Sequence, residues 1–286
     1  MQERPFFLSS PPQANQATLS GEEAHHLIHV LRAKLGDSVE LIDGKGGAWR
    51  GKVAEIRTAP LAVTINQLTE LPRNEDATLR LTLIQSLCKT DKLEWILEKT
   101  TELGISEIRL LAADRSVLKL PEHKIEAKLE RWNKIILGAA KQSRRSTLPL
   151  LFPPANCVTI CRALKAELKL VFSTDDSRSA LKDRLRQTTC RSAAFCVGPE
   201  GGWTPAERET FLRCELEPVT LGLNILRTET AAIVGTAILK YELESPDLKL
   251  TQKSCIFPLV PRRSAQRATL AGPKCVRALY CGVSLD

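Results

Sequence analysis

The sequence lacks the signals of a membrane or exported protein. None of its apolar runs approaches the roughly 20 residues that a membrane-spanning helix needs. Its first residues, MQERPFFLSSPPQANQ, have neither a basic flank before an apolar core nor an arginine-rich amphipathic pattern. Neither a secretory signal nor a transit peptide is therefore predicted, and we expect a cytoplasmic protein with no membrane partner.

The chain also lacks the usual spacing of metal ligands and disulfides. Its nine cysteines include no C-x-x-C pair, their number is odd and several lie in apolar runs, which indicates reduced, buried thiols. His25 and His29 in HHLIH would share one helix face, but no third ligand accompanies them. We expect no bound metal.

Several common catalytic and nucleotide-binding signatures are absent. There is no G-x-x-x-x-G-K-[ST] phosphate loop, and no Ser, His and Asp grouping has a nucleophile-elbow context. The sequence GKGG at residues 44–47 lies between two strand-like runs and does not open a helix. It is therefore not a dinucleotide-binding fingerprint.

Composition and charge say little about function. Hydrophobic residues make up 43% and charged residues 26% of the chain, as in soluble globular proteins, and 286 residues fit two domains. Of the net charge of +8, residues 245–286 carry +5, from seven Lys and Arg against two Asp. The remaining +3 is a weak argument for a nucleic-acid partner, so local clusters must carry that argument.

Two domains and a tail are predicted. Residues 1–73 are strand-rich: SVELIDGKGGAWRGKVAEI predicts a hairpin, LAVTINQL another strand and GEEAHHLIHVLR a helix, together a small β-barrel or sandwich. Residues 78–244 alternate between strands and helices, which predicts an α/β domain with a mainly parallel sheet. Residues 245–286 show no sustained period and predict a disordered basic extension, with an RNA-contacting tail as the alternative.

Two motifs in the α/β domain are unusual. In FCVGPEGGWTPAERE, a buried strand runs into a glycine-rich turn, and Thr204, Pro205 and Glu207 predict a helix start with a capping box. In LGLNILRTETAAIVGTAIL, a second strand ends before a loop, and Thr228 is predicted to cap a helix of small residues. Ligands bind beyond the carboxyl ends of strands in such sheets, so both loops are candidate binding walls.

The small residues of that second helix permit close packing. Ala231, Ala232, Gly235 and Ala237 would let another backbone approach closely, either a helix of the same fold or a second subunit.

VGPEGGWTPAE and LGLNILRTETA, in this order, resemble the signature of the RsmE family of SPOUT methyltransferases, which act on N3 of a uridine in 16S ribosomal RNA. Further segments agree: HHLIHVLR, GDSVELIDGKG, KTDKLEWILEKTTELGISEI, DRSV and RWNKIILGAAKQSRRSTLPLL. The resemblance runs from about Phe6 to Glu244 and excludes the tail.

The resemblance implies a trefoil-knot methyltransferase domain preceded by a PUA-like β-barrel, S-adenosylmethionine as cofactor, 16S ribosomal RNA as partner and a homodimer. The implied cofactor-binding residues are Phe172, Ser173, Gly198, Pro199, Glu200, Gly202, Leu221, Gly222, Leu226 and Thr228. The implied RNA-binding residues are Arg32, Arg115, Gln142, Arg144 and Arg145.

Methylation at uridine N3 requires a proton to leave and negative charge to develop on the base. An arginine could stabilise that charge and a carboxylate could take the proton. Arg145, Arg227 and Glu229 are the candidate catalytic residues, with Glu200 as a second carboxylate and the base unassigned.

The chain departs from the family pattern at Lys141, where glutamate is usual, and at Asn224, where arginine is often found. Two alternatives stay open: a SPOUT methyltransferase with another acceptor, a tRNA base or a ribose 2′-OH, or a non-catalytic RNA-binding relative.

Overall fold

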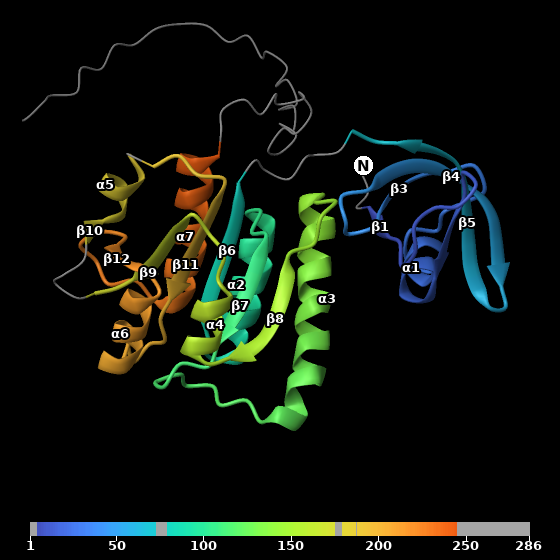
Figure 1. Ribbon diagram of the computed structural model, residues 1–286. Coiled ribbons are helices and arrows are strands. Elements are labelled where there is room, and N and C mark those ends of the chain that lie inside the picture. The colour runs from blue at the N-terminus through green and yellow to red at the C-terminus, as the bar shows by residue number, and fades with distance from the viewer. Residues whose placement is uncertain (1–4, 73–78, 175–178, 187, 245–286) are drawn as a thin grey trace, which may run out of the picture. The chain divides into compact units, whose positions relative to one another are not determined.

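The computed structural model describes residues 5–72, 79–174, 179–186 and 188–244, so the expected tail lies outside the described ranges. The first 72 residues contain a five-stranded sheet, and a seven-stranded sheet follows (Figure 1). None of the helices in the described ranges is long and apolar enough to cross a membrane.

The N-terminal sheet has the strand order β1-β3-β4-β5-β2. Its strands are β1 (Phe6–Phe7), β2 (Ala17–Ser20), β3 (Ser38–Ile42), β4 (Ala48–Thr58) and β5 (Leu61–Glu70). Strands β3 and β4 pair antiparallel, which confirms the predicted hairpin. Alternate strand residues such as Leu41, Val53 and Val63 form a core of their own.

The expected helix of this part is shorter than its pattern suggested. α1 (Gly21–His25) passes directly into a single π-helical segment, His26–Val30. Arg32 then takes a φ of 56°, a left-handed conformation in which a right-handed helix cannot continue.

The C-terminal sheet is parallel throughout its pairings, in the order β10-β12-β9-β11-β6-β7-β8. Its strands are β6 (Arg80–Ser86), β7 (Glu107–Leu111), β8 (Leu150–Ala155), β9 (Leu168–Phe172), β10 (Ser179–Ala180), β11 (Ser192–Val197) and β12 (Glu217–Thr220). The predicted α/β domain with a mainly parallel sheet is therefore confirmed.

Helices cover both faces of this sheet (Figure 1). They are α2 (Thr90–Glu102), a 3-10 turn (Glu122–Lys124), α3 (Ile125–Ser143), α4 (Cys157–Ala163), α5 (Leu181–Leu185), α6 (Pro205–Arg213) and α7 (Thr228–Leu243). One core joins α2, α3 and α7 to strand residues such as Leu83 and Phe195. A second core joins α4 and α6 to residues of alternate register, such as Ile84 and Cys196.

Candidate active site

The loop between β11 and α6 carries the first motif, and a capping box fixes its end. The Thr204 hydroxyl accepts from the Glu207 N–H, and the Glu207 carboxylate accepts from the Thr204 N–H at 2.8 Å. Pro205 occupies the first helical turn. The predicted capping box is confirmed, and the glycine-rich loop therefore enters α6 at a defined angle.

The second motif is tied directly to the first. The Thr228 hydroxyl donates to the Gly198 carbonyl at 2.9 Å and accepts from Gln85 Nε2 at 3.0 Å. The prediction that Thr228 caps α7 is wrong: Arg227 is the N-cap residue, and the Thr228 hydroxyl is committed to the neighbouring loop. Through this hydroxyl, the ends of β6 and β11 and the start of α7 lie side by side.

The end of β9 forms a third side of the same region. Trp203, in the first motif, donates its indole N–H to the Phe172 carbonyl at 3.0 Å. Ser173 follows Phe172 directly and donates its backbone N–H to the Val219 carbonyl of β12. The structure therefore brings the candidate cofactor residues of three segments to one edge of the sheet.

The glycines of these loops are of two kinds. A Cβ added at Gly198 would meet the Trp203 ring at 3.1 Å, and one added at Gly201 would meet the Arg115 side chain at 3.1 Å. Gly202 and Gly222 instead have φ of +69° and +150° with open space at the Cβ position. Such open backbone, at a helix N-terminus and a strand end, is suited to the close approach of a ligand.

The other candidate cofactor residues differ in exposure. Pro199 is buried and Glu200 is on the surface of the loop. Leu221 and Leu226 are partly buried and pack against the core. These leucines give the second loop an apolar surface.

A lysine joins the two candidate carboxylates. Lys92 Nζ lies 3.4 Å from Glu200 Oε1 and 3.2 Å from Glu229 Oε2. Burial, with the Glu200 charge as the next cause, raises the pKa of the nearby Cys88 thiol to about 12, so this cysteine is a neutral thiol. The sequence interpretation did not single out Lys92. It lies in the KTDKLE segment, in the first turn of α2, and only its spatial neighbours identify it.

Hydrogen bonds hold the loop after β7 against the first motif. The Asp114 N–H donates to Glu207 at 3.0 Å, and the Thr204 hydroxyl lies 3.1 Å from Asp114 Oδ2. Arg115 then donates from Nη1 to the Gly201 carbonyl at 3.0 Å. Arg115, a predicted RNA-binding residue, is thereby held exposed beside the glycine-rich loop.

Arg145 lies elsewhere. Its side chain is only 7% exposed, and Nη1 donates to the carbonyls of Thr101 and Ile105 at 2.8 and 2.9 Å. This placement is at odds with the expectation that Arg145 faces RNA, because the guanidinium donates to backbone carbonyls in the last turn of α2 and in the segment just after it. A buried, hydrogen-bonded arginine of this kind stabilises the fold.

The remaining RNA candidates are more accessible. Arg32 and Gln142 are exposed, and Arg144 is partly exposed. Arg227, a candidate catalytic residue, is also exposed. Arg144 is the C-cap of α3 and takes the left-handed conformation, φ 59°.

Lys141 has a specific partner. Its ammonium lies 2.7 Å from Glu23 Oε1 and 2.8 Å from Oε2, and both side chains are largely buried. The Glu23 carboxylate also accepts from the Phe7 N–H. The charge that departs from the family pattern is therefore matched by an acidic residue of α1.

We expect Lys141→Glu to destabilise the protein by about 2 kcal/mol, because it places two carboxylates together in a partly buried site. The double variant Glu23→Lys/Lys141→Glu should recover most of this loss. Urea unfolding of the four proteins of the cycle measures the coupling. Equal stability of Lys141→Glu and the wild type would show that the ion pair is of no consequence.

Comparisons with known proteins point to one kind of protein. A family model described as an RNA methyltransferase domain matches residues 75–240, and one described as an RNA methyltransferase PUA domain matches residues 19–64. The chain is 34% identical over 243 residues to Ribosomal RNA small subunit methyltransferase E of Synechocystis sp., covering 82% of this chain and 77% of that protein.

Other relatives agree. The protein of the same name from Bacillus subtilis is 30% identical over 240 residues, covering 81% of this chain and 92% of that protein. Among solved structures, a Ribosomal RNA small subunit methyltransferase E from Neisseria gonorrhoeae bound to S-adenosyl methionine is similar with a TM-score of 0.74 and 29% identity. That similarity covers 85% of this chain and 98% of the other.

Proposed function

The chain belongs to the ribosomal RNA small subunit methyltransferase E family, and we propose that it methylates N3 of a uridine in 16S ribosomal RNA. It is an S-adenosylmethionine-dependent ribosomal RNA methyltransferase with a SPOUT catalytic domain and a PUA-like N-terminal domain. The observation that carries the proposal is the hydrogen bond from the Thr228 hydroxyl to the Gly198 carbonyl. It joins the two signature loops, which are residues 198–204 and 221–227, beside Gly202 and Gly222, whose Cβ positions face open space.

The loops fit the cofactor. Gly202 and Gly222 offer backbone that a ligand can approach closely, while Leu221 and Leu226 offer apolar surface for a flat ring. We propose that these residues, with Phe172 and Ser173, hold the adenosine part of S-adenosylmethionine. When bound, the cofactor supplies a methyl group on a cationic sulfur.

The proton at N3 must leave as the methyl group arrives. The N3–H electron pair forms the N–CH₃ bond, the C–S electron pair stays on sulfur as a neutral thioether, and the proton goes to a carboxylate. The Glu200 side chain is 31% exposed, whereas that of Glu229 is 7% exposed. We propose Glu200 as the base, because a base must come within hydrogen-bond reach of its substrate.

Arg227 and Arg115 are the cations we propose for RNA phosphate contacts. Both are exposed, Arg227 at the start of α7 and Arg115 on the Gly201 carbonyl. Phosphate contacts of this kind position an RNA and make its binding depend on salt.

The proposed function is tested by mass mapping of modified nucleosides in 16S ribosomal RNA from a strain that lacks the gene. We expect one N3-methyluridine to disappear and to return when the gene is restored. Loss of a methyl group from a tRNA base or from a ribose 2′-OH would identify another acceptor. An unchanged set of nucleosides would favour an RNA-binding protein without activity.

We further propose that the active unit is a homodimer in which the outer face of α7 of one subunit packs against the same face of the other. The small residues of α7 divide between two faces. Gly235 faces the interior, where an added Cβ would lie 2.5 Å from the Phe172 ring, so Gly235 serves packing within the chain. Ala237 is partly exposed on α7, and Leu223, Ile225 and Tyr241 are strongly exposed.

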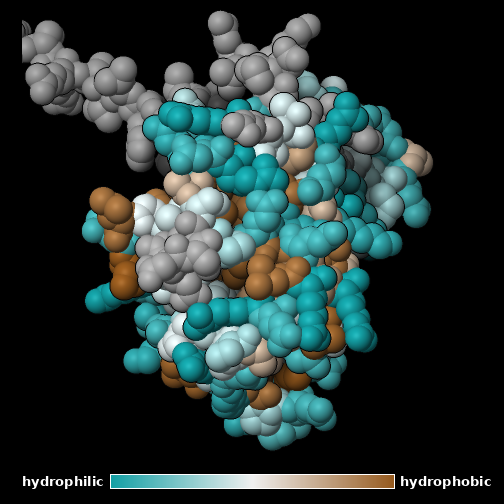
Figure 2. Space-filling model, turned by 60° about the vertical axis from the view of Figure 1, so that its left-hand side comes forward, coloured by the Kyte–Doolittle hydropathy of each residue, from teal (hydrophilic) through white to brown (hydrophobic). Residues whose placement is uncertain are grey.

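Exposed apolar groups of this kind often mark an interaction site. Figure 2 shows hydrophobic residues gathered in the middle of a largely hydrophilic face. Because Leu223 and Ile225 precede α7 and Tyr241 lies on it, the outer face of α7 and the loop before it are the surface we propose for the second subunit.

We expect Ala237→Glu to convert the dimer to a monomer and to reduce activity, because a charge would be buried in the interface. Light scattering at micromolar concentration measures the mass. Leu212→Glu, at an exposed apolar residue of α6, is the matched control and should remain dimeric. A monomeric wild-type protein under the same conditions would contradict the dimer.

A further inference from the structure

We propose that Lys92 is a positioning residue for methyl transfer, whose ammonium holds the Glu200 carboxylate in the orientation that accepts the N3 proton. This inference rests on the proposed function. It follows from the bridge that Lys92 makes between Glu200, on the first signature loop, and Glu229, in the first turn of α7.

The bridge has a buried end and an open end. The Glu229 side chain is nearly inaccessible, and a buried carboxylate is costly unless a cation is paired with it. Lys92, itself 23% exposed, supplies that cation at 3.2 Å. Glu229 thus anchors Lys92, which leaves the ammonium fixed at 3.4 Å from the more exposed Glu200.

The groups that face Lys92 come from three segments. They are Glu229 from α7, Glu200 from the loop after β11 and Cys88 from the connection between β6 and α2. Because Cys88 is a neutral thiol, the charged groups are one ammonium and two carboxylates, a net charge of −1. Such a cluster suits a site that receives a cationic methyl donor and then a proton.

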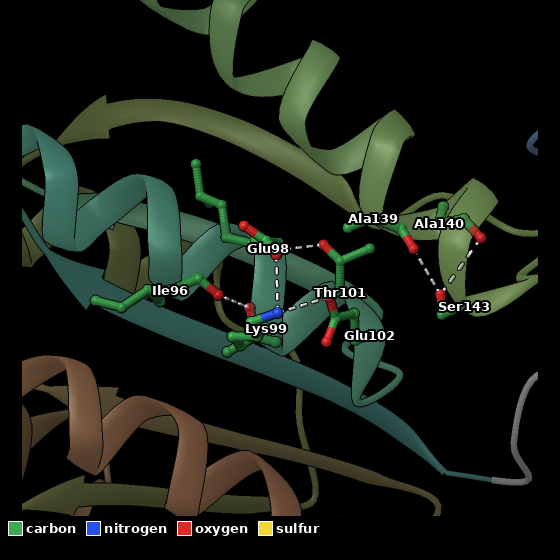
Figure 3. Close-up of polar contacts among 10 residues, drawn as sticks. Ile96, Glu98, Lys99, Thr101, Glu102, Ala139, Ala140 and Ser143 are labelled. Atoms are coloured by element: carbon green, nitrogen blue, oxygen red, sulfur yellow. Dashed lines mark hydrogen bonds and ion pairs between the residues drawn. The ribbon is translucent and has the colours of Figure 1, made fainter. Parts of the chain in front are cut away.

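Lys99, in the last turn of α2, is a matched control for Lys92. Lys99 also lies between two carboxylates, Glu98 at 2.8 Å and Glu102 at 2.9 Å, all on α2 (Figure 3). Their carboxylate partners, Glu229 first for Lys92 and Glu98 first for Lys99, raise the pKa of both lysines. Both are therefore ammonium groups at neutral pH, but Lys99 bridges residues of its own helix and touches neither signature loop.

The experiment compares Lys92→Met, Lys92→Arg and Lys99→Met with the wild type. Single-turnover methylation of small-subunit RNA, at saturating RNA and S-adenosylmethionine, is followed from acid to alkaline pH. Calorimetry measures cofactor affinity, and thermal melting checks folding.

For Lys92→Met we expect the neutral-pH rate to fall roughly 10²-fold, the scale of a lost general-base contribution, with cofactor affinity nearly unchanged. Removing an ammonium beside a carboxylate favours the protonated acid, so the rise of rate with pH should move to higher pH. Lys92→Arg should recover much of the rate, and Lys99→Met should match the wild type.

An unshifted pH profile in Lys92→Met, or no recovery in Lys92→Arg although it melts like the wild type, would overturn the positioning role. The proposed function fails separately, if the wild-type product is not N3-methyluridine. In that case a shifted pH profile would still support the positioning of Glu200 toward the other acceptor, and an unshifted profile would overturn it.

Discussion

Replacing Gly202 with valine is expected to abolish detectable binding of S-adenosylmethionine. Gly202 has a φ of +69°, and a residue with a Cβ costs roughly 1–2 kcal/mol in this left-handed region, more when it is β-branched. No neighbour lies within 4 Å of the added Cβ, so the side chain would occupy the space proposed for the ligand. The loss of binding would therefore combine loop strain with direct obstruction.

A matched glycine separates these causes. Gly36 also has a positive φ, +90°, and open space at its Cβ position, but it lies in the N-terminal part of the chain. Gly36→Val should show a similar loss of stability and bind the cofactor normally by calorimetry. A folded Gly202→Val protein with unchanged affinity would place the cofactor elsewhere.

Arg145→Ala is expected to lower the free energy of unfolding by about 3 kcal/mol, because it removes a buried side chain and leaves two buried carbonyls without their charged donor. The donor is Nη1, and the carbonyls belong to Thr101, in the last turn of α2, and to Ile105, just after the helix. Urea unfolding measures the change. Activity should fall because less protein is folded.

The neighbouring arginine is the control. Arg144 has a φ of 59°, so Arg144→Gly should relieve backbone strain and leave stability equal or higher. If Arg144 contacts RNA phosphate, the same variant should weaken RNA binding and reduce its salt slope by about 1. A stable Arg145→Ala protein whose single-turnover rate alone falls would restore Arg145 as a catalytic residue.

The sequence predicted most of the fold because its local signals agree with the structure. The period-2 runs of residues 38–56 form the β3–β4 hairpin, and the capping residues Thr204 and Glu207 start α6. The sequence of β8, LLFPPA, carries no clear strand signal because it holds two prolines, which a strand tolerates here because β8 is at the sheet edge. The helical stretch that begins with α1 ends at Val30, just before Arg32 takes a left-handed φ that no periodicity indicates.

The site was predictable only where the signal is local. Glycine-rich sequences at strand ends predicted the two loops that the Thr228 hydroxyl brings together, because such loops are unusual in a strand-to-helix connection. The partners of Lys92 and Arg145 are more than 35 residues away in sequence, and their contacts depend on how α2 packs. Arg145 lies in the basic sequence KQSRR, which is typical of an exposed segment, but its side chain is buried.

The most direct test of the account is the product made by the purified protein. Small ribosomal subunits from a strain without the gene are incubated with the full chain and methyl-labelled S-adenosylmethionine, and the labelled nucleoside is identified by mass spectrometry. The account predicts N3-methyluridine at one position of 16S ribosomal RNA, absent when Gly202→Val protein is used. Label in any other nucleoside, or no label with a folded wild-type dimer, would contradict it.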